Sequence, residues 1–141
     1  MRKMLTTIAA ACGLATTMFA ATVNLANLTA DRTFADGDVI TGRLGSRLKL
    51  SIADGATVTL SNASIYLTHN WDSPWAGLTC EGDATIVLVG NNYVWSLCNG
   101  YPGIRPAAGR TLTIRGTGSL NAKGLRASAG IGGGYYCAGH R

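Results

Sequence analysis

The sequence predicts an all-β protein folded as a parallel β-helix, a solenoid whose coils span about 26–28 residues. A strand phrase recurs at positions 57–60, 85–88 and 111–114, so its three copies are almost evenly spaced. A glycine followed by an apolar residue keeps nearly the same spacing: Gly77 with Leu78, Gly103 with Ile104, and Gly130 with Ile131. Two independent markers with one period indicate an internal repeat.

Apolar and polar residues mostly alternate within each strand phrase, which is typical of half-buried strands. Stacked coils are expected to form two internal columns: Val58, Ile86 and Leu112, and then Leu60, Leu88 and Ile114. Each buried aliphatic side chain contributes roughly 1.5–3 kcal/mol. Turns at residues 61–62, 90–92 and 116–118 leave room for about three short strands in a repeat and for no helix. An antiparallel sandwich is the competing prediction, since it also uses short strands and glycine-rich turns.

Residues 1–21 are predicted to be a secretory signal peptide. Arg2 and Lys3 precede a mostly small and apolar run over residues 4–19, and two alanines follow. Lipidation at Cys12 is the alternative for this segment. No other stretch reaches the roughly 20 apolar residues that a membrane span needs. The mature protein is therefore expected to be secreted, extracellular or on the cell surface.

Residues 22–141 are predicted to form one β-helix domain. Residues 23–34 lead in, with a first strand expected around Val23, Leu25 and Leu28. Strands over residues 39–44, 48–52 and 57–60 are expected to form the first full coil. Without Arg2 and Lys3, the 12 basic residues fall to ten against seven acidic ones, a net charge of +3. This mild charge and the lack of a Lys/Arg-rich run predict no nucleic-acid partner.

The last repeat has its glycine marker but no strand phrase after it before Arg141. We therefore expect an incomplete coil at the C-terminus. An open coil exposes apolar columns and unpaired strand backbone, so self-association through this end is expected.

The glycine-rich run, the cysteines and the acidic residues are each explained best by a structural role. The glycine-rich run at residues 129–134 lacks the following helix of a phosphate-binding loop, so tight turns or close backbone approach are expected. Cys80 is expected to be a small buried residue, and the disulfide state of Cys80, Cys98 and Cys137 stays open. The acidic residues mostly lie beside glycine at turns, where Asp satisfies the backbone, with Ca²⁺ binding or hydrolysis as alternatives.

Aromatic residues cluster in and around the loops between strands, where they are expected to stack on sugar rings. Neighbouring basic residues are expected to pair with the carboxylates of an acidic glycan. The predicted carbohydrate-binding residues are Trp71, Trp75, Trp95, Tyr101, Arg105, Lys123 and Arg126. Tyr135 and Tyr136 follow the last glycine marker. The alternative is that these rings only cover the ends of the coils.

Residues 53–65, 82–92, 101–120 and 129–134 resemble a family of exported bacterial carbohydrate-binding domain proteins of the parallel β-helix type. The similarity covers nearly the whole predicted mature chain. It implies polysaccharide binding, with Ca²⁺ as a further ligand.

The leading functional hypothesis is therefore a non-catalytic polysaccharide-binding module of an exported protein. A structural surface or adhesin-type repeat without a sugar site is the second hypothesis. A polysaccharide lyase or hydrolase on the same fold is the third. Arg110 and Arg115 are available for such chemistry, but no acidic residue recurs beside them in the repeat.

Overall fold

The computed structural model describes residues 19–67 and 74–134, and this part of the chain is all-β with parallel sheets. Residues 1–18 of the signal peptide predicted over 1–21 lie outside the described residues, as do Trp71, Tyr135, Tyr136 and Cys137. The described elements are β1 Thr22–Asn24, the 3-10 helix η1 Leu25–Asn27, β2 Arg32–Phe34, β3 Val39–Arg43, β4 Leu50–Ile52, β5 Ala56–Leu67, β6 Leu78–Cys80, β7 Ala84–Val89, β8 Asn91–Asn99, β9 Ile104–Arg105, β10 Leu112–Gly116 and β11 Ser119–Leu125.

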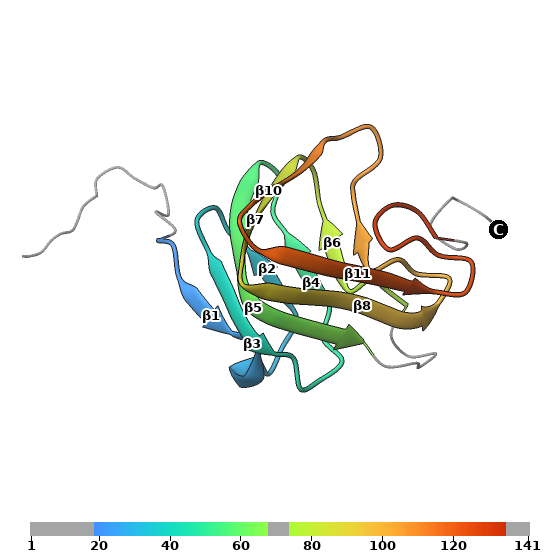
Figure 1. Cartoon of the computed structure of the whole chain (residues 1–141), viewed down its shortest axis with the longest axis horizontal. Coiled ribbons are helices and arrows are strands. Elements are labelled where there is room, and N and C mark those ends of the chain that lie inside the picture. Colours follow the sequence, from blue (N-terminus) through green and yellow to red (C-terminus); the bar gives the residue numbers. More distant parts are fainter. Residues whose placement is uncertain (1–18, 68–73, 135–141) are drawn as a thin grey trace, which may run out of the picture.

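The strands form two sheets whose neighbours come from successive repeats (Figure 1). One sheet runs β1-β3-β5-β7-β10, and the second half of its long strand β5 also pairs with β8, which pairs with β11. The other sheet runs β2-β4-β6-β9. Every pairing between these named strands is parallel, so the antiparallel sandwich is wrong for the described residues. None of the described helices is long and apolar enough to cross a bilayer.

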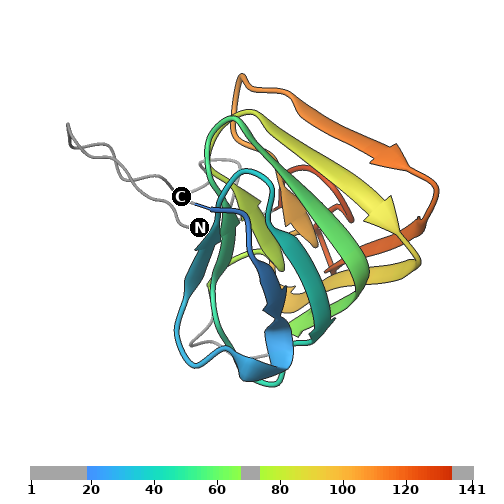
Figure 2. The same cartoon turned by 90° about the vertical axis from the view of Figure 1, so that its left-hand side faces the viewer.

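The predicted repeat length holds for the later strands. Ala56 pairs with Ala84, and Leu78 pairs with Ile104, so both pairings join residues one predicted period apart. The first repeats are shorter than predicted, since Thr22 pairs with Val39, and Val39 pairs with Thr59. Figure 2 shows the successive repeats, from blue to orange, lying side by side in chain order.

The predicted internal columns are correct in their first two members and wrong in the third. Val58 and Ile86 pair in register, but their next partner is Ile114, and Leu60 and Leu88 are followed by Gly116. The segment from Ile104 to Leu112 is longer than the segment from Leu78 to Ala84. Its extra length shifts β10 along β7, so the matching Thr-Leu-Thr-Ile phrase is offset from its structural partner.

The glycine markers align as predicted. Leu78 pairs with Ile104, and Ile104 forms a parallel bridge to Ile131. A Cβ on Gly77 would lie 2.7 Å from the Gly103 oxygen, and a Cβ on Gly103 would lie 2.7 Å from the Gly130 oxygen. These glycines therefore allow adjacent repeats to approach at this column.

The N-terminal strand ends earlier than predicted, and residues Leu25–Asn27 form one 3-10 turn. The Asn24 side chain favours this turn because its Oδ1 accepts a 3.0 Å hydrogen bond from the Ala26 N–H. Leu25 is fully buried, so the turn still contributes to the common core.

A buried asparagine links three repeats where β7 turns into β8. Asn92 is 1% exposed, and its Oδ1 accepts a 2.9 Å hydrogen bond from the Ala63 N–H. Its Nδ2 donates to the carbonyl oxygens of Val89 and Ser119, at 3.1 and 3.2 Å. Because each partner lies on a different strand, this side chain fixes the relative position of β5, β8 and β11.

Candidate functional site

The outer face of β3, β5, β8 and β11 carries a group of aromatic and basic side chains. Strand alternation places Ile65 and Val94 in the core at 0% exposure, so their neighbours Tyr66 and Trp95 point outward. The parallel register puts Tyr66 beside Trp95 and Trp95 beside Lys123. One outward residue therefore comes from each of three neighbouring strands at this level.

These side chains form a continuous row, here called the aromatic–cation strip: Arg43, Tyr66, Tyr93, Trp95 and Lys123. The Arg43 guanidinium lies 5.1 Å from the centre of the Tyr66 ring. The Tyr66 and Trp95 rings meet edge to face at 5.1 Å, and the Lys123 Nζ lies 4.9 Å from the Trp95 ring. Tyr93 stacks on Tyr66 at 6.2 Å. Such contacts hold aromatic rings and cations in fixed relative positions.

A hydrogen bond to the next strand further orients Trp95. Its indole Nε1–H donates to Asn121 Oδ1 at 2.8 Å, which connects β8 to β11. Trp95 and Tyr66 are half-buried, whereas Lys123 is exposed. The strip therefore offers a supported aromatic surface bordered by positive charge, which suits a planar apolar ligand face with anionic substituents.

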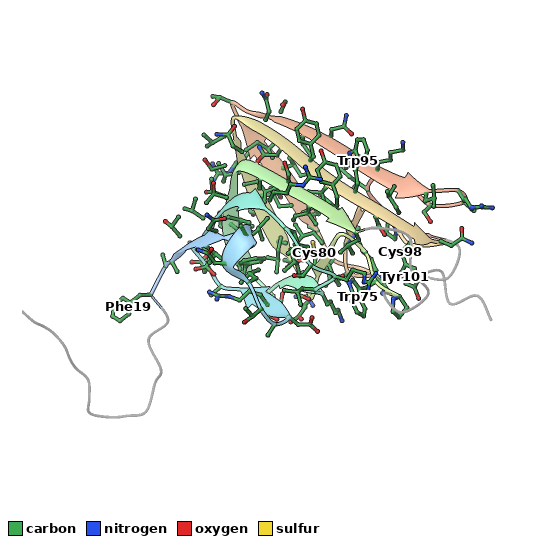
Figure 3. The ribbon with its side chains drawn as sticks, turned by 90° about the horizontal axis from the view of Figure 1, so that it is seen from below. Phe19, Trp75, Cys80, Trp95, Cys98 and Tyr101 are labelled. Carbon is green, nitrogen blue, oxygen red and sulfur yellow. The ribbon has the colours of Figure 1, made fainter. Side chains whose placement is uncertain are left out.

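Trp75 and Tyr101 lie away from the strip, as Figure 3 shows by the separate positions of Trp95 and of these two residues. Both pack against the hydrophobic core. The Trp75 Nε1 is buried and has no hydrogen-bond partner among the described residues, and the Trp75 carbonyl oxygen accepts a 3.4 Å hydrogen bond from Ser96 Oγ. Their surroundings are those of packing residues.

Arg105 and Arg126 are exposed and occupy other positions. Arg105 ends β9 in the second sheet, and Arg126 follows β11 with a positive φ of 59°. Of the seven predicted binding residues, the strip contains Trp95 and Lys123. The sequence interpretation did not include Arg43, Tyr66, Tyr93 or Asn121. Alternation within β8 would have identified Tyr93 and Trp95 as outward residues. Tyr66 could not be found this way from Val58 and Leu60, because the inward positions of β5 shift by one residue at Asn62, which has a positive φ.

An open pocket of about 510 Å³ adjoins one end of the strip. Its lining comes from the end of β3, the loop after it and the end of β5: Arg43, Leu44, Gly45, Ser46, Arg47 and Tyr66. Backbone pairing holds this region together, since the Leu44 N–H donates to the Ser64 oxygen at 2.9 Å.

Aspartate side chains of the described residues accept hydrogen bonds from turn backbone, as the structural interpretation predicted. Thr57, Asp83 and Thr111 donate their backbone N–H groups to the carboxylates of Asp36, Asp54 and Asp83 respectively, at 2.8, 3.0 and 2.9 Å. Arg110 bridges two of these turns, with Nη2 2.8 Å from Asp54 and Nε 3.3 Å from Asp83. The Thr111 N–H, and then Arg110, hold the pKa of Asp83 below its ordinary value.

The described residues contain no group of three or more His, Cys, Asp or Glu side chains that could hold a metal ion. Cys80 is buried, as predicted, and its thiol is free; burial raises the pKa of this thiol to about 11. A thiol with this pKa is a poor nucleophile at neutral pH.

No known protein family, curated protein or solved structure matches this chain. Its function is therefore inferred from the side-chain geometry.

Proposed function

We propose that the chain is an exported, non-catalytic module that binds polysaccharide, with acidic glycans preferred, on a parallel β-helix. The parallel pairing of strands from successive repeats supports the β-helix. The aromatic–cation strip is the observation that carries the binding proposal. Tyr66 and Trp95 offer aromatic surface to sugars beside the cations that pack on their rings, and Arg43 and Lys123 offer positive charge at the two ends.

Affinity-gel electrophoresis with neutral and acidic polysaccharides tests this function. The protein should be retarded by at least one of them, and added salt should reduce retardation by the acidic ones. Absence of retardation on every polysaccharide would contradict binding. The appearance of reducing ends or unsaturated products would instead support the lyase or hydrolase hypothesis.

A structural surface repeat is the second candidate, and one observation favours it. The members of the strip contact each other across neighbouring strands, and such cross-strand pairs also stabilise sheets. Under this alternative the wild-type protein binds no polysaccharide, and replacing Trp95 would only lower the free energy of unfolding.

We also propose self-association through the last repeat. Leu112, Ile114 and Leu120 are half-buried, whereas their partners Ala84, Ile86 and Asn92 on the preceding repeat are buried. A second copy placed against this face would cover the three side chains. Sedimentation velocity across a concentration series tests this, and a monomer at all concentrations would contradict it.

A further inference from the structure

The pocket beside the strip is lined by basic and not by acidic side chains. Two of its six lining residues are arginines, and none is acidic. Both arginines are exposed. The only ion pairs among the described residues belong to Arg110, so neither Arg43 nor Arg47 has a carboxylate partner there.

Arg43 is held in place by the ring beneath it. Its guanidinium lies 5.1 Å from the Tyr66 ring centre, and Tyr66 itself contacts Tyr93 and Trp95. A guanidinium is planar and presents its N–H groups as a fork that matches carboxylate and sulfate oxygens. An arginine already placed against a ring loses less side-chain freedom when it binds an anion.

We propose that Arg43 and Arg47 form an anion-binding subsite for a carboxylate or sulfate group of a glycan whose neighbouring sugar rings contact Tyr66 and Trp95. This inference rests on the proposed polysaccharide-binding function and adds the location and chemistry of one subsite. The loop around Gly45 and Ser46 leaves room for the substituent, since a Cβ on Gly45 would meet nothing within 4 Å.

The distance between the two cationic ends of the strip also favours a ligand with repeated anionic groups. Arg43, Tyr66, Trp95 and Lys123 come from four neighbouring strands, so the two ends are three strand spacings apart, about 14 Å. A chain with repeated anionic groups engages both ends, whereas a glycan with one anionic group engages one. Polymers with repeated charges should therefore bind more tightly than singly charged oligosaccharides.

Binding measurements on Arg47→Gln and on the double variant Arg43→Gln/Arg47→Gln test the subsite. The ligands are polygalacturonate, which carries carboxylates, dextran sulfate, which carries sulfates, and a neutral dextran and xyloglucan. We expect the double variant to bind the preferred acidic polymer about tenfold more weakly. Its affinity for any neutral polymer that binds should stay within about twofold. Arg47→Gln keeps the contact between Arg43 and Tyr66, so it tests the pocket without disturbing the strip.

Arg115→Gln is the matched control, because Arg115 is an exposed arginine on β10 outside the pocket. An equal loss of acidic-polymer binding in this control, or unchanged binding in the double variant, would overturn the subsite while leaving polysaccharide binding intact. Whichever acidic polymer shows the loss identifies the substituent as carboxylate or sulfate.

If the wild-type protein binds no polysaccharide, the proposed function fails and the subsite is judged separately. NMR of the arginine Nε–Hε groups during titration with glucuronate and with glucose then decides. Shifts of the Arg43 and Arg47 signals with glucuronate alone support the subsite, and unchanged signals overturn it.

Discussion

The backbone N–H of Ala21 donates a 2.9 Å hydrogen bond to Oδ1 of Asp38, whose side chain is almost completely buried. The other carboxylate oxygen accepts a 2.9 Å hydrogen bond from the Ala35 N–H. The Val39 N–H in turn donates to the Ala21 oxygen at 2.8 Å. One carboxylate therefore joins the start of β1 to the turn between β2 and β3.

Replacing Asp38 should destabilise the fold. Asp38→Ala leaves the N–H groups of Ala21 and Ala35 without their acceptor, at a cost of about 1–3 kcal/mol for each unsatisfied donor. Chemical denaturation of the wild type and the variant measures the change. Asp31→Ala is a control with a smaller expected loss, because among the described residues Asp31 accepts only the exposed Lys49 N–H. Equal losses in the two variants would contradict the role of burial.

Cleavage of the signal peptide after Ala20 should add a positive charge to the contact between Ala21 and Asp38. The predicted signal peptide spans residues 1–21, and the mature chain is expected to start at Ala21 or Thr22. Cleavage after Ala20 would convert the Ala21 N–H into an ammonium group facing Asp38, whereas cleavage after Ala21 would remove this contact. The intact mass of the exported protein distinguishes the two starts. A secreted species that retains Met1 would contradict export with cleavage, and an acylated Cys12 would establish the lipoprotein alternative.

Trp95 and Trp75 should behave differently when replaced by alanine. Trp95→Ala should weaken polysaccharide binding by at least about tenfold, because it removes the centre of the aromatic–cation strip. Trp75→Ala should mainly lower the free energy of unfolding, by about 3 kcal/mol, because this ring packs against the core. Gel retardation and denaturation of both variants separate the effects. Loss of binding in a stably folded Trp75→Ala protein would return Trp75 to the binding surface.

Asp83 should make stability depend on pH in the acid range. The pKa of Asp83 in the folded protein is lower than its ordinary value of 3.8, first because it accepts the Thr111 N–H and then because of Arg110. The contribution of Asp83 to the free energy of unfolding is therefore complete above its ordinary pKa and is lost as pH falls through the lowered pKa. Urea unfolding at a series of acid pH values should show a shallower decline in Asp83→Asn than in wild type. An equal decline in the two proteins would contradict the role of Asp83.

Gly103 should be intolerant of a side chain. A Cβ there would lie 2.7 Å from the Gly130 oxygen and 2.8 Å from the Lys123 nitrogen, so adjacent repeats would have to separate. We expect Gly103→Ala to lower the free energy of unfolding by about 1–3 kcal/mol. Gly133→Ala is the control, since its Cβ would meet nothing within 4 Å. Similar stability in the two variants would contradict close packing at the glycine column.

Local patterns in the sequence predicted many of the strands and the length of the later repeats, but not the continuous strand β5, which runs through the turn predicted at residues 61–62. Alternation identified the inward residues of β5 and β7, and the glycine markers aligned as predicted. The register of β10 was not predictable from the matching phrase. It depends on the length of the segment before it, and the loop residues carry no periodic signal that fixes this length. The buried position of Asn92 was missed because a Gly-Asn-Asn sequence is typical of an exposed turn.

The binding surface was harder to predict than the strands. Trp75 and Tyr101 lie in loop sequence, where aromatic rings are expected to be exposed, yet both cover the core. Tyr66 lies on β5, one repeat before Tyr93 and Trp95 on β8, so these rings meet only after parallel pairing. Arg43 joins them through a shorter repeat, where Arg43 pairs with Ser64. Grouping residues by loop therefore separated side chains that the register places together.

The register of the strip gives this surface an unusual capacity for evolutionary and engineered change. Tyr66, Trp95 and Lys123 occupy the same structural position in three consecutive repeats. Duplicating one repeat in the gene would therefore extend the row by one position at the same strand spacing, about 4.8 Å, without redesigning its neighbours. Changing the residue at that single position would in turn change the one side chain that the repeat contributes to the aromatic–cation strip. Ligand length and ligand charge pattern would then be set independently, by the number of repeats and by one codon in each.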